Sequence, residues 1–352
     1  GEVANEGADL EETTLMLSGA YKTGDWKFKA QYAQATAEGD DLPAPSDEAD
    51  LTAYAIGADY ALGKATTVGA YYGSSSIEID GLSGSIDTTV LGFVYRPSWL
   101  PGFDFSVDWY NIKIKDPIFA PDPNLMIAAC YGYHGINPSL DANNVYCDGT
   151  FARTPDIAQV VIPEELGGDG SYFLAINQGK IKTSGVDVQL GYSLPTDVVS
   201  ERSSISANLY LNYLIDFKVQ ELPGVTLDYA DTVSYFGQGL GTSFPRWKGN
   251  LNLAWQFDAI TLSSRIRYID GMKNRAAVQF PGEEASFTGV NAVWYFDFAA
   301  QVNVDALTFR IGVNNAFNKA PPIYSPNVQS GTDPSLYDVI GRRAYVTAGL
   351  KF

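Results

Sequence analysis

The chain has 352 residues, of which 45% are hydrophobic and 13% aromatic, and its formal net charge is −18. Its mean hydropathy of −0.08 excludes a bundle of membrane-spanning helices, and no stretch approaches the roughly 20 apolar residues that each such helix needs. The negative charge argues against nucleic acid as a partner, because binding phosphates needs a positive field. Acidic residues concentrate in 38–41 and 47–50, where they either favour solubility or form an acidic rim that holds divalent cations or repels anions.

Apolar and polar residues alternate along about thirteen segments of the chain, a pattern that predicts strands with one apolar face. In chain order the segments are 13–22, 25–36, 51–62, 66–77, 87–96, 103–111, 178–194, 205–217, 247–257, 260–270, 292–302, 307–314 and 343–352. In 205–217, for example, the odd positions from Ile205 to Phe217 are apolar, while Asn208, Asn212 and Asp216 stand among the even ones.

The length of these segments distinguishes a membrane barrel from a soluble sandwich, since the strands of both alternate. They run about ten to fourteen residues, whereas soluble strands usually run about 5–6 and membrane-spanning strands need about 9–11. Aromatic residues near the segment ends suit girdles at two membrane interfaces, and they include Trp26, Tyr60, Trp99, Trp247 and Phe257. We therefore predict an all-β fold, a transmembrane antiparallel up-and-down β-barrel with about 12–14 visible strands, whether complete or incomplete.

The connections between segments are of two kinds, short and long. Short ones include 97–102, 195–203, 258–259 and 304–306, and long ones cover 37–50, 117–175, 219–245, 271–291 and 319–341. Barrels keep short turns periplasmic and long loops outside, which places the C-terminus inside and, counting back, the N-terminus outside. The strand number is then odd, whereas bacterial single-chain barrels have an even number. We therefore expect either a missed or invented strand, or a chain that is a fragment or a fusion lacking its upstream part.

The chain has two cysteines, Cys130 and Cys147, both in one long segment without periodicity. An even count at short separation predicts a disulfide in an oxidising compartment such as the periplasm or cell surface. His134 is the only histidine, so we predict neither a metal site nor a Ser-His-Asp or Cys-His arrangement. No glycine-rich loop follows a strand and opens a helix. We expect no enzyme and no cofactor.

In the predicted barrel the polar side of each strand faces the lumen. Charged rings there select solutes by sign and size, or opposite charges simply pair across neighbouring strands. The phase of the alternation points eleven charged residues inward, namely Lys27, Lys29, Asp59, Asp104, Asp108, Asp187, Lys248, Arg265, Arg267, Asp297 and Arg310. Tyr345 and the terminal Phe352 are the predicted C-terminal assembly signal, with the barrel-assembly machinery and outer-membrane lipid as partners.

Two parts of the sequence resemble two families of outer-membrane proteins. Residues from about 87 to 352 resemble the C-terminal part of a TonB-dependent outer-membrane receptor, through the runs 93–116, 177–187, 244–250, 312–322 and 337–352. Residues from about 10 to 73 are similar to a Gram-negative general porin, through the runs 17–22, 26–32, 55–64 and 66–73. The likeness implies porin-like strands in 1–86 and receptor-like strands in 87–352, joined in one continuous barrel without a plug domain.

The resemblance also implies a place and a function. The place is the outer membrane of a Gram-negative cell, and Cys130 and Cys147 fit the cysteine-bearing loop of such receptors. The function is receptor-type uptake of a nutrient such as a metal chelate, with the TonB system as partner only if a plug exists upstream. The alternatives are a passive diffusion porin for small hydrophilic solutes and a structural barrel without transport. The two resemblances fit either a truncated receptor or a barrel joined from two sources.

Overall fold

A computed structural model describes most of the chain. The described residues are 11–38, 48–79, 82–119, 123–142, 144, 147, 152–154, 157–161, 176–177, 179–196, 200, 202–222, 224–233, 243–284, 287–324 and 331–350.

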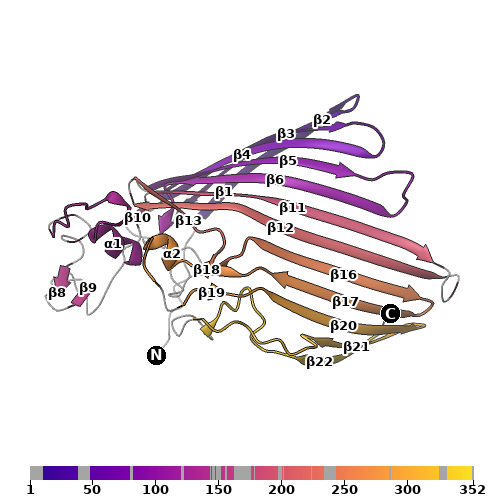
Figure 1. Ribbon diagram of the computed structural model, residues 1–352. Helices are drawn as coiled ribbons and strands as arrows, with labels where there is room; N and C mark the ends of the chain where they lie inside the picture. Colours follow the sequence, from indigo (N-terminus) through magenta and orange to yellow (C-terminus); the bar gives the residue numbers. More distant parts are fainter. Residues whose placement is uncertain are drawn as a thin grey trace, which may run out of the picture.

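One large, curved antiparallel sheet dominates the molecule (Figure 1). Thirteen strands follow one another in chain order across it: β1 (Glu11–Thr23), β2 (Trp26–Glu38), β3 (Glu48–Ala61), β4 (Thr66–Ile79), β5 (Leu82–Tyr95), β6 (Phe103–Lys115), β11 (Lys180–Thr196), β12 (Ser203–Leu222), β16 (Trp247–Phe257), β17 (Ile260–Ile269), β20 (Val293–Val304), β21 (Leu307–Asn314) and β22 (Arg343–Leu350). A short strand, β13 (Val225–Asp228), pairs with the end of β12. In the part of the chain that is described, β1 and β22 form the two edges and do not pair with each other.

Each of the thirteen predicted segments corresponds to one of these strands, which confirms the antiparallel up-and-down fold and the visible strand count. The sheet runs without a break across the predicted boundary at residues 86 and 87, because β5 contains both. Short turns lie at one end of the sheet, as between β1 and β2 and between β16 and β17. Longer connections gather at the other end, beside the N-terminal label in Figure 1.

The two faces of the sheet differ in polarity because cross-strand partners point to the same side. One row of direct partners runs Leu190, Leu209, Leu251, Ile266 and Phe296 across β11, β12, β16, β17 and β20. Every member of this row is apolar, and the neighbouring row on the opposite face carries polar residues. We call the side of this row the apolar face and the other side the polar face.

Aromatic side chains border the apolar face at both ends. At the long-loop end the rings of Tyr213 and Trp247 lie 4.4 Å apart between centroids, and those of Tyr268 and Trp294 lie 4.5 Å apart. At the short-turn end Trp26 contacts Tyr60 at 4.7 Å, and the indole of Trp99 donates a hydrogen bond to Tyr95. β16 begins at Trp247 and ends at Phe257. Ten residue steps cover about 34 Å, or about 25 Å along the membrane normal at a 40° tilt, which matches the apolar band of a barrel.

The long connections contain small elements of their own. They are β7 (Ile118–Phe119), α1 (Pro123–Cys130), a 3₁₀ turn (Tyr133–Gly135), β8 (Ala152–Thr154), β9 (Ile157–Val161), β10 (Ile176–Asn177), β14 (Thr232–Val233), β15 (Ser243–Phe244), β18 (Met272–Asn274), α2 (Ala276–Gln279) and β19 (Gly289–Val290). Among the described residues, no helix is long and apolar enough to cross a membrane. The predicted disulfide between Cys130 and Cys147 is present and ties α1 to the chain that follows it.

The most deeply buried apolar residues lie at the long-loop end. One cluster includes Leu125, Ile181, Val219, Val225 and Tyr229. It packs α1 against β13 and the long-loop ends of β11 and β12. A second cluster includes Val233, Met272, Val293, Tyr295 and Tyr337. The long loops are therefore packed together over this end of the sheet.

A β-bulge in β12 changes the alternation that the sequence predicts through Phe217. Gly185 pairs with Leu214 and Ser184 pairs with Asp216, so Ile215 is an extra residue without a partner on β11. From Asp216 onward the two faces are exchanged relative to the predicted phase, and the ring of Phe217 stacks on Phe244 at 4.1 Å. The prediction that Phe217 continues the apolar face is wrong, because a bulge shifts the register by one residue.

Candidate functional site: the polar face of the sheet

All eleven charged residues that the sequence points inward lie on the polar face. On β2, Lys27 is the cross-strand partner of Asp59 on β3, and Lys29 lies on the same face of β2. Asp108 on β6 is the partner of Asp187 on β11. Asn212 on β12 is the partner of both Asp187 and Lys248. Arg265 and Arg267 lie on the same face of β17, and Arg265 is the partner of Asp297 on β20. Arg310 on β21 is the partner of Gln301. Tyr345 also lies on this face, opposite Gly312, whereas Phe352 lies outside the described residues.

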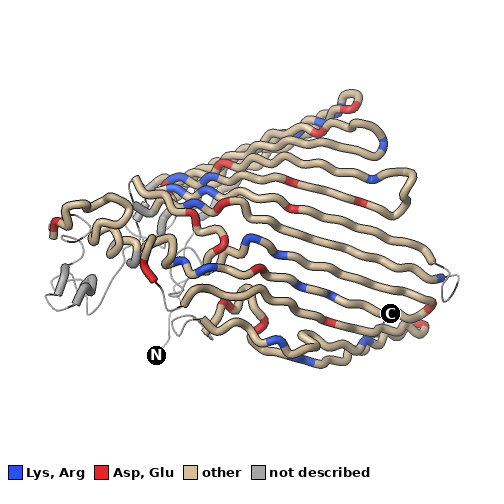
Figure 2. Tube along the Cα trace, in the orientation of Figure 1, with Lys and Arg blue, Asp and Glu red and all other residues tan. Residues whose placement is uncertain are grey.

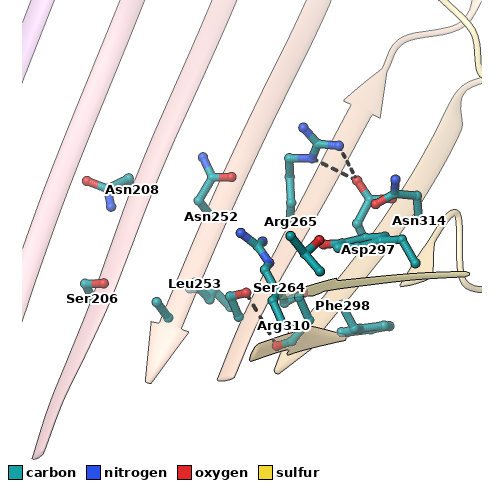
Figure 3. Close-up of a pocket in the computed structure, with 15 residues that line it drawn as sticks. Ser206, Asn208, Asn252, Leu253, Ser264, Arg265, Asp297, Phe298, Arg310 and Asn314 are labelled. Atoms are coloured by element: carbon teal, nitrogen blue, oxygen red, sulfur yellow. Dashed lines mark hydrogen bonds and ion pairs between the residues drawn. The ribbon is translucent and has the colours of Figure 1, made fainter. Parts of the chain in front are cut away.

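A cavity of about 570 Å³ lies on the polar face where β12, β16, β17, β20, β21 and β22 run side by side. Figure 3 shows Arg265 directed at Asp297, with Asn314 and Arg310 near them. The Arg265 Nε and Nη2 atoms lie 2.8 and 2.6 Å from Asp297 Oδ2. Hydroxyl and amide side chains from Ser206 and Asn252 line the other side. Such a surface offers both hydrogen-bond donors and acceptors to a polar solute.

Asp297 is the centre of a larger ion-pair network. Its side chain is only 8% exposed, and a buried carboxylate needs partners to offset the loss of water. The backbone N–H of Asn315 donates to Asp297 Oδ1 at 2.7 Å, and Arg267 Nη2 lies 3.6 Å from the same oxygen. Arg267 also approaches Asp338 Oδ2 at 3.7 Å, and Arg343 approaches it at 3.5 Å. The network therefore connects the sheet to the loop between β21 and β22.

A second network lies on β2, β3 and β4. Lys29 Nζ is 2.8 Å from Asp59 Oδ2 and donates to the Tyr71 hydroxyl at 2.8 Å. The Tyr71 hydroxyl in turn donates to Asp59. These three side chains bind one another across three neighbouring strands. In this part of the face, opposite charges therefore pair across neighbouring strands.

Between these networks lie three carboxylates without a basic partner. Asp104, Asp108 and Asp187 make no ion pair among the described residues, and Asp108 stands directly opposite Asp187. Asn212 Nδ2 donates to Asp187 Oδ1 at 2.8 Å. No group of three or more His, Cys, Asp or Glu side chains in the described chain is arranged to hold a metal ion.

Pairing of opposite charges therefore accounts for only part of the charged residues, and solute selection by the others stays a prediction. Lys29, Asp59, Arg265, Arg267 and Asp297 form ion pairs. The other six, within the described residues, have no oppositely charged side chain within 4.0 Å, and they are Lys27, Asp104, Asp108, Asp187, Lys248 and Arg310. Arg310 lies over the ring of Tyr345, with 6.0 Å between the guanidinium carbon and the ring centroid.

Tyrosines on this face lie over glycines of the neighbouring strand. Tyr71 faces Gly57, Tyr110 faces Gly185 and Tyr345 faces Gly312, and each pair consists of direct register partners. A Cβ atom at any of the three glycines would overlap the tyrosine ring. A close approach of this kind is a packing reason for glycine inside a strand.

Sequence reasoning missed several contributors to the face. Tyr71 and Asn212 complete hydrogen-bond networks, and Ser206, Asn208 and Asn252 line the cavity. Their signal was available, because each stands at a polar position of an alternating segment. A charge-based selection excludes neutral residues, so it left them out.

Comparisons with known proteins agree with this architecture. A family profile described as Gram-negative porin matches residues 2–79. No curated protein sequence matches the chain. Among solved structures, the FrpB iron transporter of Neisseria meningitidis is similar with a TM-score of 0.60 and 15% identity, covering 97% of this chain and 45% of that one.

Two further solved structures show the same likeness. The siderophore receptor PiuA of Acinetobacter baumannii has a TM-score of 0.54 and 13% identity, covering 96% of this chain and 42% of that one. A mutant of the ferric enterobactin receptor of Pseudomonas aeruginosa has a TM-score of 0.53 and 13% identity, covering 98% and 54%. The chain thus spans about half the length of these solved structures.

The large antiparallel sheet, with one apolar and one polar face, has the fold of a transmembrane β-barrel wall. The sheet has the architecture found in the barrels of these receptors, and the solved structures that it matches are transporters and receptors. The porin match agrees with the same class. Together these findings agree with the predicted place in the outer membrane of a Gram-negative cell.

Proposed function

We propose that the chain forms the barrel part of a receptor-type transporter that takes up a nutrient such as a metal chelate. The observation that carries the proposal is the agreement of nearly the whole sheet with barrels of iron and siderophore receptors, together with long, packed loops at one end. The receptor-like strands of 87–352 contain the cavity and its ion-pair network, while the porin-like strands of 1–86 complete the sheet.

The polar face supplies chemistry that suits an anionic chelate. Arg310 and Lys248 are cationic groups without a carboxylate partner in the described chain, so their positive charge is available to a solute. Asn208, Asn252 and Ser206 add neutral donors and acceptors around the cavity. A hydrogen bond to a charged group contributes about 1.5–3 kcal/mol, which is enough for one arginine to be measurable in binding.

The alternative function is a passive diffusion porin for small hydrophilic solutes. The match of residues 2–79 to the Gram-negative porin family favours it. The TonB system as an energising partner stays a prediction. The assembly role of Tyr345 and its recognition by the barrel-assembly machinery also stay predictions.

Conductance in a planar lipid bilayer separates the two functions. The full chain is reconstituted and the current is recorded under a steady voltage. The receptor proposal expects a closed or unstable channel, whereas a steady open channel of constant conductance favours the porin.

Chelate binding is the second measurement. A ferric tris-catecholate complex is titrated against the detergent-solubilised chain while its tryptophan fluorescence is followed. We expect saturable quenching, and Arg310→Gln should weaken binding by about 10-fold. The matched control is Lys64→Gln, because Lys64 lies in the short turn between β3 and β4, away from the cavity. A chain that shows neither conductance nor binding would be a structural barrel, contrary to both functions.

A further inference from the structure

Five lysines gather on the outer side of the sheet at its long-loop end. They are Lys113 and Lys115 on β6, Lys180 and Lys182 on β11, and Lys218 on β12, and we call them the lysine cluster. Lys113 pairs with Lys182, Lys115 with Lys180, and Lys182 with Lys218 in the register of the sheet. Figure 2 shows these blue segments side by side where the strands reach the long loops.

The cluster lies on the same side as the apolar face but beyond its aromatic border. Trp109, Val186, Tyr213 and Trp247 form one row of cross-strand partners at that border. Lys113 follows Trp109 by four residues on the same side of β6. Four residues cover about 13 Å of strand, or about 10 Å along the membrane normal at a 40° tilt. The ammonium groups are therefore at the level of lipid headgroups.

The opposite side of the same strand segments is apolar. Ile114 and Ile181 are direct partners that alternate with the lysines, and they pack with Val219 against the loop cluster around Leu125. Beyond the aromatic border, therefore, the inner side of the wall is hydrophobic and the outer side is cationic. A wall that merely faced water would not need its cations concentrated here, because the chain as a whole carries a net charge of −18.

Carboxylates neutralise only part of the cluster. Asp216 lies 3.0 Å from Lys182 and 3.2 Å from Lys218, and Asp87 lies 3.4 Å from Lys115. Asp228, the register partner of Lys218, accepts hydrogen bonds from the backbone N–H groups of Phe217 and Ala230. Asp87 is the register partner of Lys113 but pairs with Lys115, so Lys113 and Lys180 have no carboxylate within 4.0 Å among the described residues.

Where no carboxylate neutralises the lysines this arrangement costs stability, because like charges directly opposite each other in a sheet repel. Lys113, Lys115, Lys180 and Lys182 occupy the corners of a rectangle. Its sides are about 5 Å across the strands and about 7 Å along them. Flexible ammonium groups at such corners converge on an oxyanion between them, and lysine is a common ligand of phosphate.

We propose that the lysine cluster binds the phosphate groups of a phosphorylated glycolipid in the outer leaflet. The apolar face directly below the cluster would hold the acyl chains, which is why the occupant is a lipid and not a free anion. Bound lipid would then fix the depth of this part of the wall in the membrane. The proposal depends on the apolar face contacting lipid and is independent of what the lumen transports.

The test compares the full chain in detergent micelles with two double variants. Lys113→Gln/Lys180→Gln removes the two lysines of the cluster that make no ion pair among the described residues. Lys64→Gln/Arg96→Gln removes two positive charges from exposed residues of short turns at the other end of the sheet. Each protein is titrated with diphosphorylated lipid A, with lipid A lacking both phosphates and with inorganic phosphate. Binding is read from native mass spectra and from the shift of the melting temperature.

We expect the wild type and the Lys64→Gln/Arg96→Gln variant to bind diphosphorylated lipid A equally. Lys113→Gln/Lys180→Gln should bind it about 30-fold more weakly, since each lysine near an anionic lipid surface contributes a factor of about five. Without lipid this variant should melt no earlier than the wild type, because two opposed like-charge pairs are removed. Equal binding by both variants, equal binding of the dephosphorylated lipid, or binding of inorganic phosphate as tight as that of the lipid would overturn the proposal.

Discussion

An arginine at the centre of the apolar face should destabilise the folded protein far more than one on the polar face at the same depth. Leu190 lies in the row of Leu209 and Leu251 and is four residues from Val186 in the aromatic border row. This distance is about 13 Å along the strand, or about 10 Å along the normal, so Leu190 is close to the midplane of a 25 Å apolar band. Leu190→Arg should therefore lower the free energy of unfolding by about 3 kcal/mol, or about 150-fold in the folding equilibrium.

The matched control is the preceding residue. Gln189 pairs with Ser106 and Tyr210 on the polar face, so Gln189→Arg places the same side chain at the same depth but toward the lumen. Its cost should stay within about 0.5 kcal/mol. The assay is urea unfolding of the chain after it has been folded into short-chain phosphatidylcholine vesicles, followed by tryptophan fluorescence.

Equal costs for Leu190→Arg and Gln189→Arg would refute the assignment of the two faces. A stronger refutation would be a purified chain that stays monodisperse without detergent. Hydrocarbon could then not be what contacts Leu190 and its neighbours.

Three other predictions concern the loops and the glycine contacts. Cys130→Ala/Cys147→Ala should speed proteinase K cleavage around α1 while the strands stay protected. The disulfide joins residues 17 apart in sequence, and closing a loop of that length stabilises the folded loop by about 3 kcal/mol. Unchanged cleavage would contradict this prediction. Gly312→Val should cost about 1–3 kcal/mol in urea unfolding by clashing with the Tyr345 ring, and adding Tyr345→Ala should recover part of it. Burial raises the pKa of Tyr337 above its unfolded value of about 10. The neutral phenol therefore stabilises the folded protein fully below pH 10, and this stabilisation is lost as the pH rises further. The melting temperature of Tyr337→Phe should fall less between pH 9 and pH 11 than that of the wild type.

The strands could be predicted from sequence because each one has a lipid-facing side. Alternation in 247–257 is nearly uninterrupted, and β16 has those bounds. The weaker segments 66–77 and 87–96 are parts of β4 and β5, and both strands extend further toward each other than predicted. Polar residues such as Glu78, Ser83 and Ser85 continue them outside the apolar band. The bulge at Ile215 could not be predicted, since it depends on how Ser184 pairs with the partner strand.

For the polar face, the sequence likewise predicts which side a residue lies on but not which residue it pairs with. The face of each charged residue follows from the parity of its strand, so Lys29 and Arg265 could be assigned from sequence. Their partners could not, because pairing depends on register between strands that are separated by long loops. The lysine cluster is the clearest case: the patterns at Lys113 and Lys115 and at Lys180 and Lys182 are visible in the sequence, but only the register places them opposite each other.

The direction of the two edge strands determines how the barrel wall can be completed. Because thirteen strands alternate in direction, β1 and β22 both run from the long-loop end to the short-turn end. Joining them directly would create a parallel seam, whose hydrogen bonds are slightly weaker than those of antiparallel strands. Leaving both edges bare in hydrocarbon would cost several kcal/mol for each unpaired backbone group. One interposed strand would restore antiparallel pairing on both sides, and the seam is therefore the place where the wall can most easily admit a strand of another origin.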